Sequence, residues 1–230
     1  MKPPSVEKEF TVRILPALAA SGFKRAGGKR FARVSADVIQ FLFINVRSSS
    51  RREFMLEYTS LLAFEPHLQP SLAHGGSFPL GSRSSVWHRA DSEESLHRSC
   101  DKVSESLPEL LQWFDATASL AGFMVSYQAR LQHEPPALRH NGHSSFTLAC
   151  GTAAAGDLTA ASDHLQQAVT EFQTTLQDFA AEYPDTADDH WARERLHRCE
   201  ELATAIREEG LPILISGWRE ASIATLKLSV

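Results

Sequence analysis

The sequence predicts an α+β protein, with an N-terminal helix and a small antiparallel sheet around a central strand, followed by a helical C-terminal half of antiparallel helices. Between residues 23 and 62, short apolar runs alternate with turns, as in strands joined by hairpins. From Asp91 onward, apolar residues recur every three or four positions, which is the spacing of helices. We therefore expect an α+β domain over residues 1–132, a linker over 133–143, and a helical hairpin or bundle over 144–230 that packs on the first domain.

The N-terminal segment predicts a helix and a hairpin. Ser5 can cap a helix that extends toward Gly22, and Pro16 is expected to kink that helix or end it early. Residues 23–25 and 30–34 are expected to form two short strands around a glycine turn.

Val38–Val46 gives the strongest strand pattern in the chain. Both of its faces are mostly apolar, which predicts a central strand covered on both sides. Gln40 and Asn45 are the polar exceptions, one on each face. A buried amide needs hydrogen-bond partners, so each is either a satisfied core amide or a contact to a ligand.

The middle of the chain predicts a further strand over 54–62 and a long proline- and glycine-rich loop over 64–90, with an edge strand near 84–88. Helices then follow, with a break expected at Leu107-Pro108, a second helix over 109–114 and a third near 118–131.

The C-terminal half predicts a helix over 146–155, a long helix capped by Asp157 that reaches Tyr183, and a helix capped by Asp185 that runs to Gly210. The two long helices should pack antiparallel. Residues 211–230 could form a helix or a terminal strand, and the helix is favoured.

Composition excludes several classes of protein. The 230 residues carry a net charge of −5 and include 43% hydrophobic residues, which is ordinary for a globular protein and makes nucleic acid an unfavourable partner. With no apolar stretch near the ~18 residues needed to span a bilayer and no N-terminal signal pattern, we expect a cytoplasmic protein without a membrane partner. The oligomeric state stays open.

Four segments follow one another in a recognisable order: Gly22-Phe-Lys-Arg25 after a helix, Arg30-Phe-Ala-Arg33, the strand Val38–Val46 ending in polar residues, and Trp87-His88 before a leucine-rich helix. Over residues 8–132 this order resembles the uncharacterised bacterial domain-of-unknown-function family 4304. The resemblance implies an α+β domain and brings no known catalytic residues. Some relatives are thought to serve as immunity proteins beside bacterial toxins, which the resemblance extends to this chain as an expectation.

Catalytic and metal motifs are weak. His190, Glu194 and His197 share a helix face that should point to solvent, and the histidines at 140 and 143 have no evident third ligand. Cys100 follows His97 on one helix face, but nothing in the pattern supplies an activated thiol. We therefore expect no metal and no cofactor, and favour a non-enzymatic protein.

The charges are unevenly distributed. Residues 1–60 hold 11 Lys/Arg and 5 Asp/Glu, a net charge of +6, whereas the remainder holds 12 and 23, a net charge of −11. An acidic helical face is expected to bind a basic protein partner, such as a toxin; alternatively it is a solvated face or docks on the basic hairpin of the same chain. Its predicted residues are Asp163, Glu171, Asp178, Glu182, Asp185, Asp188 and Asp189.

A second hypothesis is a small-molecule-binding module, or an uncharacterised enzyme, with a site near Gln40, Asn45 and Trp87. His88 belongs to the same candidate ligand site.

Overall fold

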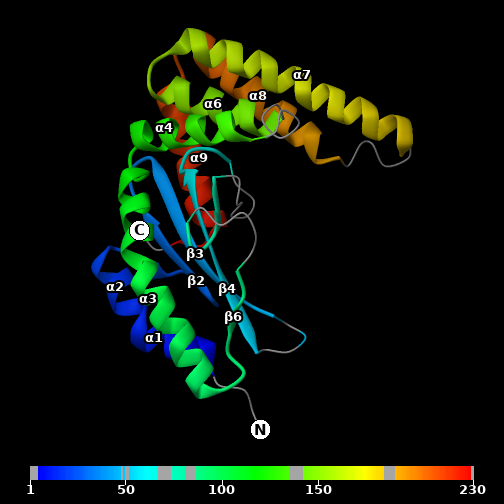
Figure 1. Ribbon diagram of the computed structural model, residues 1–230. Coiled ribbons are helices and arrows are strands. Elements are labelled where there is room, and N and C mark those ends of the chain that lie inside the picture. The colour runs from blue at the N-terminus through cyan, green and yellow to red at the C-terminus, as the bar shows by residue number, and fades with distance from the viewer. Residues whose placement is uncertain are drawn as a thin grey trace. The chain divides into compact units, whose positions relative to one another are not determined.

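The computed structural model describes residues 5–47, 49, 52–66, 74–80, 86–134, 142–183 and 190–228 (Figure 1). The chain divides into two compact units. The sheet unit comprises residues 1–63, 67–123 and 223–230, and the helical unit comprises residues 64–66 and 124–222. The division falls inside a helix, between Phe123 and Met124. Most of the linker expected over 133–143, namely residues 135–141, lies outside the described residues.

The sheet unit contains an antiparallel sheet in the order β1-β2-β3-β4-β5, with β6 also paired to β4. Its strands are β1 Lys24–Arg25, β2 Arg30–Val34, β3 Val38–Val46, β4 Glu53–Leu62, β5 Gly75–Ser77 and β6 His88–Arg89. β3 pairs with β2 on one side and along its whole length with β4 on the other. The prediction of a central strand over Val38–Val46 is confirmed.

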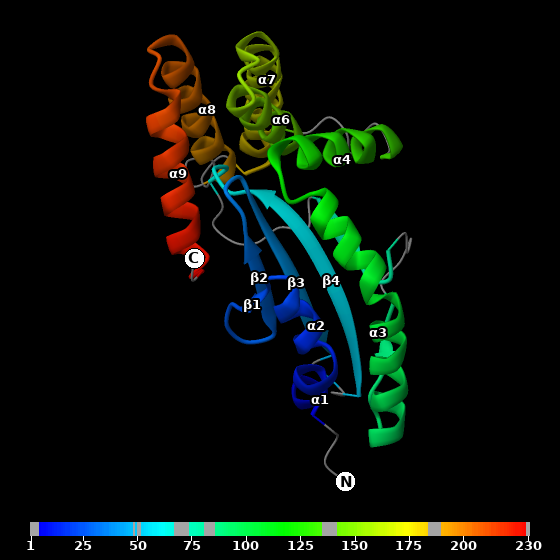
Figure 2. The same ribbon diagram turned by 90° about the vertical axis from the view of Figure 1, so that its left-hand side faces the viewer.

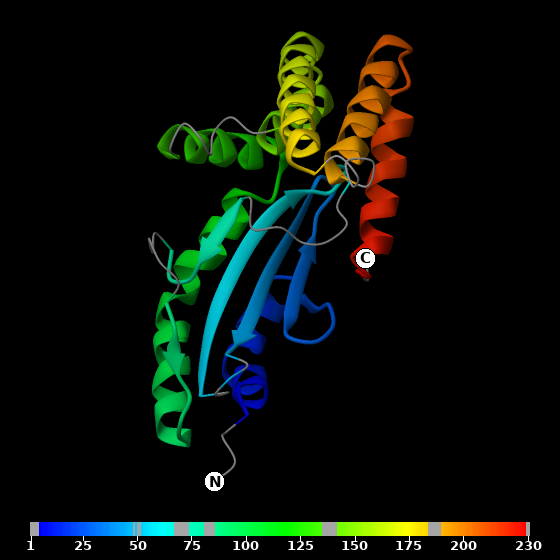
Figure 3. The same ribbon diagram turned by 90° about the vertical axis from the view of Figure 1, so that its right-hand side faces the viewer.

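Three helices belong to the first face of the sheet: α1 Val6–Arg13, α2 Leu15–Ala20 and α3 Glu93–Ala116. Figures 2 and 3, taken from opposite sides, both show α3 running along the sheet. Ser5 caps α1 as predicted, and the expected single helix becomes two, with Pro16 in the first turn of α2.

The break expected at Pro108 is wrong, because α3 runs through it without interruption. Val103, Leu107, Leu110 and Phe114 form one buried seam that continues on both sides of the proline, whose ring lies on the exposed face. Burial of each large apolar side chain contributes about 1.5–3 kcal/mol, so the seam together outweighs the ~3 kcal/mol that a proline costs inside a helix.

The second face of the sheet has a smaller core. Ile39, Phe41 and Leu61 are buried there against Leu226, near the end of the chain. Arg30 holds this segment in place by donating a hydrogen bond from Nη2 to the Leu226 carbonyl at 2.9 Å. These contacts explain why residues 223–230 belong to the sheet unit.

The helical unit contains α6 Gly142–Ala154, α7 Leu158–Glu182, α8 Trp191–Arg207, most of α4 Leu120–His133 and most of α9 Leu211–Thr225. α7 packs against both α6 and α8 (Figure 1).

Asp157 caps α7 and Tyr183 ends it, as predicted. Asp185 lies outside the described residues, and α8 begins later than expected, with His190 as its cap. The helix favoured after residue 211 is confirmed as α9. None of the described helices is long and apolar enough to cross a membrane.

Candidate functional site

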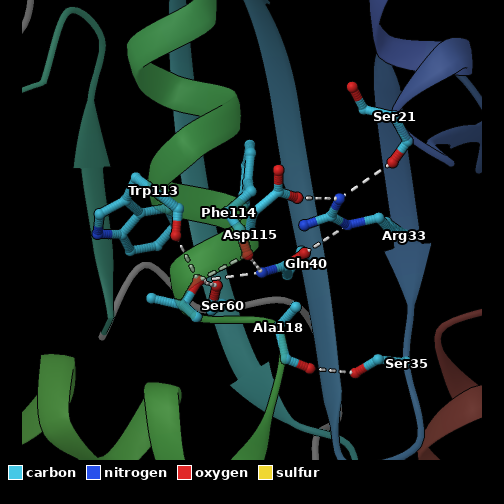
Figure 4. Close-up of polar contacts among 10 residues, drawn as sticks. Ser21, Arg33, Ser35, Gln40, Ser60, Trp113, Phe114, Asp115 and Ala118 are labelled. Carbon is cyan, nitrogen blue, oxygen red and sulfur yellow. Dashed lines mark hydrogen bonds and ion pairs between the residues drawn. The ribbon is translucent and has the colours of Figure 1, made fainter.

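Both polar atoms of the Gln40 amide make hydrogen bonds inside the sheet unit. Its Nε2 donates to the Phe114 carbonyl at 2.5 Å and to Thr117 Oγ1 at 3.0 Å, and its Oε1 accepts from Arg33 Nε at 2.7 Å. Thr117 in turn contacts Ser60 Oγ at 3.0 Å (Figure 4). This buried network joins three strands to the end of α3, so Gln40 is a satisfied core amide.

Asn45 lies on the other face of β3, where it donates to the Glu57 carboxylate. Trp87 lies near the end of that strand, with the Arg47 guanidinium 4.5 Å above its ring. The structure therefore does not bring Gln40 together with Asn45 or Trp87. His88, the remaining member of the predicted ligand site, lines a groove of the sheet unit.

A groove of about 720 Å³ runs along α3 in the sheet unit. One wall is the segment 86–89, which includes Trp87 and His88, together with Phe78 and Pro79. The other wall is a polar stripe of α3 at a helical spacing of three and four residues, which comprises Ser92, Ser95, Ser99, Lys102 and Ser106. Sequence reasoning missed this stripe, although its spacing was available as a second periodicity that flanks the apolar seam.

His88 has an unusual environment in this groove. It pairs with Phe54 across β6 and β4, and the two rings stack with centroids 5.1 Å apart. Its Nε2 is buried and has no hydrogen-bond partner among the described residues. Burial lowers the pKa of His88, and the nearby positive charge of Lys102 lowers it further, so the ring is neutral near pH 7.

The ion pairs leave one cation of the groove without an acidic partner in the described part of the chain. Arg89 pairs with Asp91 at 2.7 Å, and Arg98 pairs with Glu94 at 3.0 Å. Lys102 lines the same groove and makes no such ion pair, and the acid Glu105, three residues further along α3, lines it as well. Ser99 Oγ donates to the Arg89 carbonyl at 2.7 Å and so fixes β6 against α3.

The predicted acidic residues behave differently from one another. Asp163, Asp178 and Glu182 are exposed on α7, whereas Glu171 accepts hydrogen bonds from Ser145 Oγ at 2.7 Å and Gln167 Nε2 at 3.0 Å. Glu171 is thus engaged within the helical unit. The other three predicted residues, Asp185, Asp188 and Asp189, lie outside the described residues.

The cysteines are unsuited to nucleophilic chemistry. All three are buried free thiols, and burial raises the pKa of Cys100 to about 11, that of Cys199 to about 12, and that of Cys150 well above its usual value. Within the described ranges, no group of three or more His, Cys, Asp or Glu side chains is arranged to hold a metal ion.

No protein family model, no curated protein and no solved structure matches this chain at a significant level. The resemblance to family 4304 therefore stays a prediction.

Proposed function

We propose that this chain is a non-enzymatic binding protein that takes a small molecule into the α3 groove. The observation that carries the proposal is a cavity of about 720 Å³ with Trp87 and His88 on one wall and a polar stripe of α3 on the other. Its volume lies within the range of small-molecule sites, which is about 300–1,000 Å³.

A binding role fits the groove better than catalysis because its serines are already engaged. Ser92 and Ser95 form the capping box of α3, and Ser99 and Ser106 donate to backbone carbonyls. A serine nucleophile needs a hydroxyl that faces a base, and these hydroxyls face the backbone.

A screen of small molecules by thermal unfolding tests this proposal. We expect compounds that raise the melting temperature of the native chain to lose that effect in Ser106→Trp, in which the indole occupies the groove. Ser162→Trp is the matched control, since Ser162 is exposed on α7 and donates to the carbonyl four residues earlier, as Ser106 does. Equal ligand effects in both variants would contradict the groove as the binding site.

A second candidate function is binding of a basic protein partner, such as a toxin, through α7. It is favoured by Asp163 and Asp178, exposed acids that make no ion pair in the described part of the chain. Uncompensated carboxylates on a partner-binding surface raise the association rate of a basic protein and make binding sensitive to salt.

Charge reversal tests this second candidate. For a basic partner identified by cross-linking, Asp163→Lys with Asp178→Lys should slow association and reduce its dependence on ionic strength. Glu109→Lys, an exposed acid on α3, is the control. An unchanged association rate in the α7 variant would exclude this face.

A further inference from the structure

The helical unit has a groove of its own, of about 510 Å³, between α8 and the start of α9. Figures 2 and 3 both show α9 returning beside α8 after a short turn. α8 contributes positions 197, 200, 201, 204 and 205, which recur at the three- and four-residue spacing of one helix face. Eight residues of α-helix rise about 12 Å, so the α8–α9 groove follows this face for just over two turns.

The α9 side of the α8–α9 groove is apolar. Ile213 is 81% exposed there, and the neighbouring Leu214 is half-buried. Ala205 is short, and Gly210 has no side chain; a Cβ at position 210 would meet Ala205 Cα at 3.9 Å, an ordinary van der Waals distance. A single exposed apolar side chain is common on protein surfaces. Ile213 and Leu214 differ from that case because they line one hollow and can be covered together.

The α8 side of the same groove is acidic. Glu200 and Glu201 line it, and its described lining includes no lysine or arginine. Glu201 is compensated by Arg198 Nη1 at 2.9 Å, whereas Glu200 has no lysine or arginine partner in the described part of the chain. His197 lies between the two acids, with ring nitrogens 3.9 Å from Glu200 and 3.7 Å from Glu201.

The turn between the two helices adds to this acidity. Glu208 and Glu209 are exposed and make no ion pair within the described ranges. Arg207 precedes them and donates from Nη2 to Thr204 Oγ1 at 3.2 Å. Positions 200–210 thus hold four acids and one arginine, so the surroundings of the groove carry a net negative charge.

We propose that the α8–α9 groove binds a basic amphipathic helix of a partner protein, whose apolar face covers Ile213 and Leu214 and whose lysine or arginine side chains reach Glu200. Grooves between helices bind amphipathic helices through apolar anchors at three- and four-residue spacing. Charge complementarity speeds the encounter and selects a basic partner. The groove includes neither the α3 groove nor Asp163 and Asp178 of α7, so the inference is independent of both functions proposed above.

Fluorescence anisotropy of the full chain with three labelled synthetic peptides tests the inference. Each has about twenty residues, enough to form a helix. The first carries leucine on one face and lysine on the other; the second replaces lysine with glutamate, and the third replaces leucine with serine. The first should bind at least about tenfold more tightly than the others, because each of these lacks one complementary feature. Added salt should weaken its binding.

Two substitutions connect the affinity to the groove. Ile213→Ser removes the exposed apolar anchor, and Glu200→Lys reverses the uncompensated charge; each should weaken binding of the first peptide by about fivefold or more. Both side chains are exposed, so the melting temperature should stay close to that of the native chain. Val125→Ser, at a side chain 69% exposed on α4, and Glu109→Lys, at an exposed acid of α3, are the matched controls and should leave the affinity unchanged.

The possible outcomes distinguish this groove from the other surfaces. Equal affinity for the lysine and glutamate peptides would overturn the basic character of the partner. Binding that persists in both Ile213→Ser and Glu200→Lys would overturn the groove as the site, and its loss in Asp163→Lys with Asp178→Lys would place the peptide on α7 instead. Failure of the first peptide to bind would overturn the inference and leave the small-molecule screen of the α3 groove unaffected.

Discussion

The His88 side chain has opposing effects on stability. Its stacked ring contributes to the sheet unit, while its buried Nε2 without a described partner costs free energy. A buried polar group left unsatisfied costs about 1–3 kcal/mol.

His88 and His143 make the unfolding free energy depend on pH, and the sign of this dependence follows from the burial of the two rings. Burial lowers the pKa values of His88 and His143, with further lowering by Lys102 and Arg195 respectively. Between the lowered folded pKa and the unfolded value near 6.5, the unfolded chain binds more protons than the folded chain. Unfolding free energy is therefore highest above pH ~6.5 and falls as pH decreases through that range.

Urea unfolding at several pH values between neutral and mildly acidic measures this slope. His88→Phe should raise the unfolding free energy by about 1–3 kcal/mol near neutral pH and reduce the loss on acidification. Combining it with His143→Phe should reduce the loss again. A double variant that loses stability with acid as steeply as the native chain would contradict the assignment to these two rings.

Gln40 and Asn45 form a matched pair of amides on one strand with different structural roles. Gln40→Ala removes three hydrogen bonds of a buried network and leaves Arg33 Nε without its partner, so we expect the unfolding free energy to fall by at least about 2 kcal/mol. Asn45→Ala removes a half-buried amide with one described partner and should cost clearly less. Equal losses in denaturant titrations would show that the network contributes little.

At the scale of elements, β5 depends on one glycine. A Cβ on Gly75 would lie 1.8 Å from the Tyr58 carbonyl oxygen, a backbone atom that cannot move without disturbing β4. A Cβ on Gly76 would meet the Tyr58 side chain at ordinary van der Waals distance, with the hydroxyl nearest at 3.5 Å. Close backbone approach therefore fixes the residue at position 75 and leaves position 76 tolerant.

Gly75→Ala should weaken the pairing of β5 with β4 and lower the unfolding free energy by about 1–3 kcal/mol, as overpacking does elsewhere. Gly76→Ala is the matched control and should change stability by less than about 1 kcal/mol. Amide exchange at Ser77 and Phe78 reports the local effect. Slow exchange of these amides in Gly75→Ala would show that the strand adapts to the methyl group.

The elements that could be predicted are those whose pattern is local. The strand over Val38–Val46, the Asp157 cap and the helix to Tyr183 follow from side-chain periodicity and capping within a few residues. The continuity of α3 through Pro108 could not be predicted, because it depends on a seam buried against distant strands. The groove was missed because only tertiary contacts bring Phe78, β6 and the polar stripe of α3 to one cavity.

At the scale of the whole molecule, contacts inside the sheet unit account for part of the uneven charge distribution of the sequence. Several N-terminal cations are used inside the sheet unit: Arg33 binds Gln40, the Ser21 carbonyl and Asp115, and Arg30 binds the Ala26 and Leu226 carbonyls. The positive excess of residues 1–60 is therefore partly a structural property of the sheet. On α7, Glu171 accepts from Ser145 and Glu182 is hydrogen-bonded to Tyr183, whereas Asp163 and Asp178 make no ion pair in the described part of the chain.

Leu226 shows that the end of the chain stabilises the beginning. It is 2% exposed and packs on the core of Ile39, Phe41 and Leu61, between 165 and 187 residues earlier in the sequence. Leu226→Ala should lower the unfolding free energy by about 2–5 kcal/mol and accelerate amide exchange in β2 and β3. Ile213→Ala is the control, because that side chain is 81% exposed on α9, the helix that ends just before Leu226. Unchanged exchange in β2 and β3 would mean that the sheet holds its second face without the returning segment.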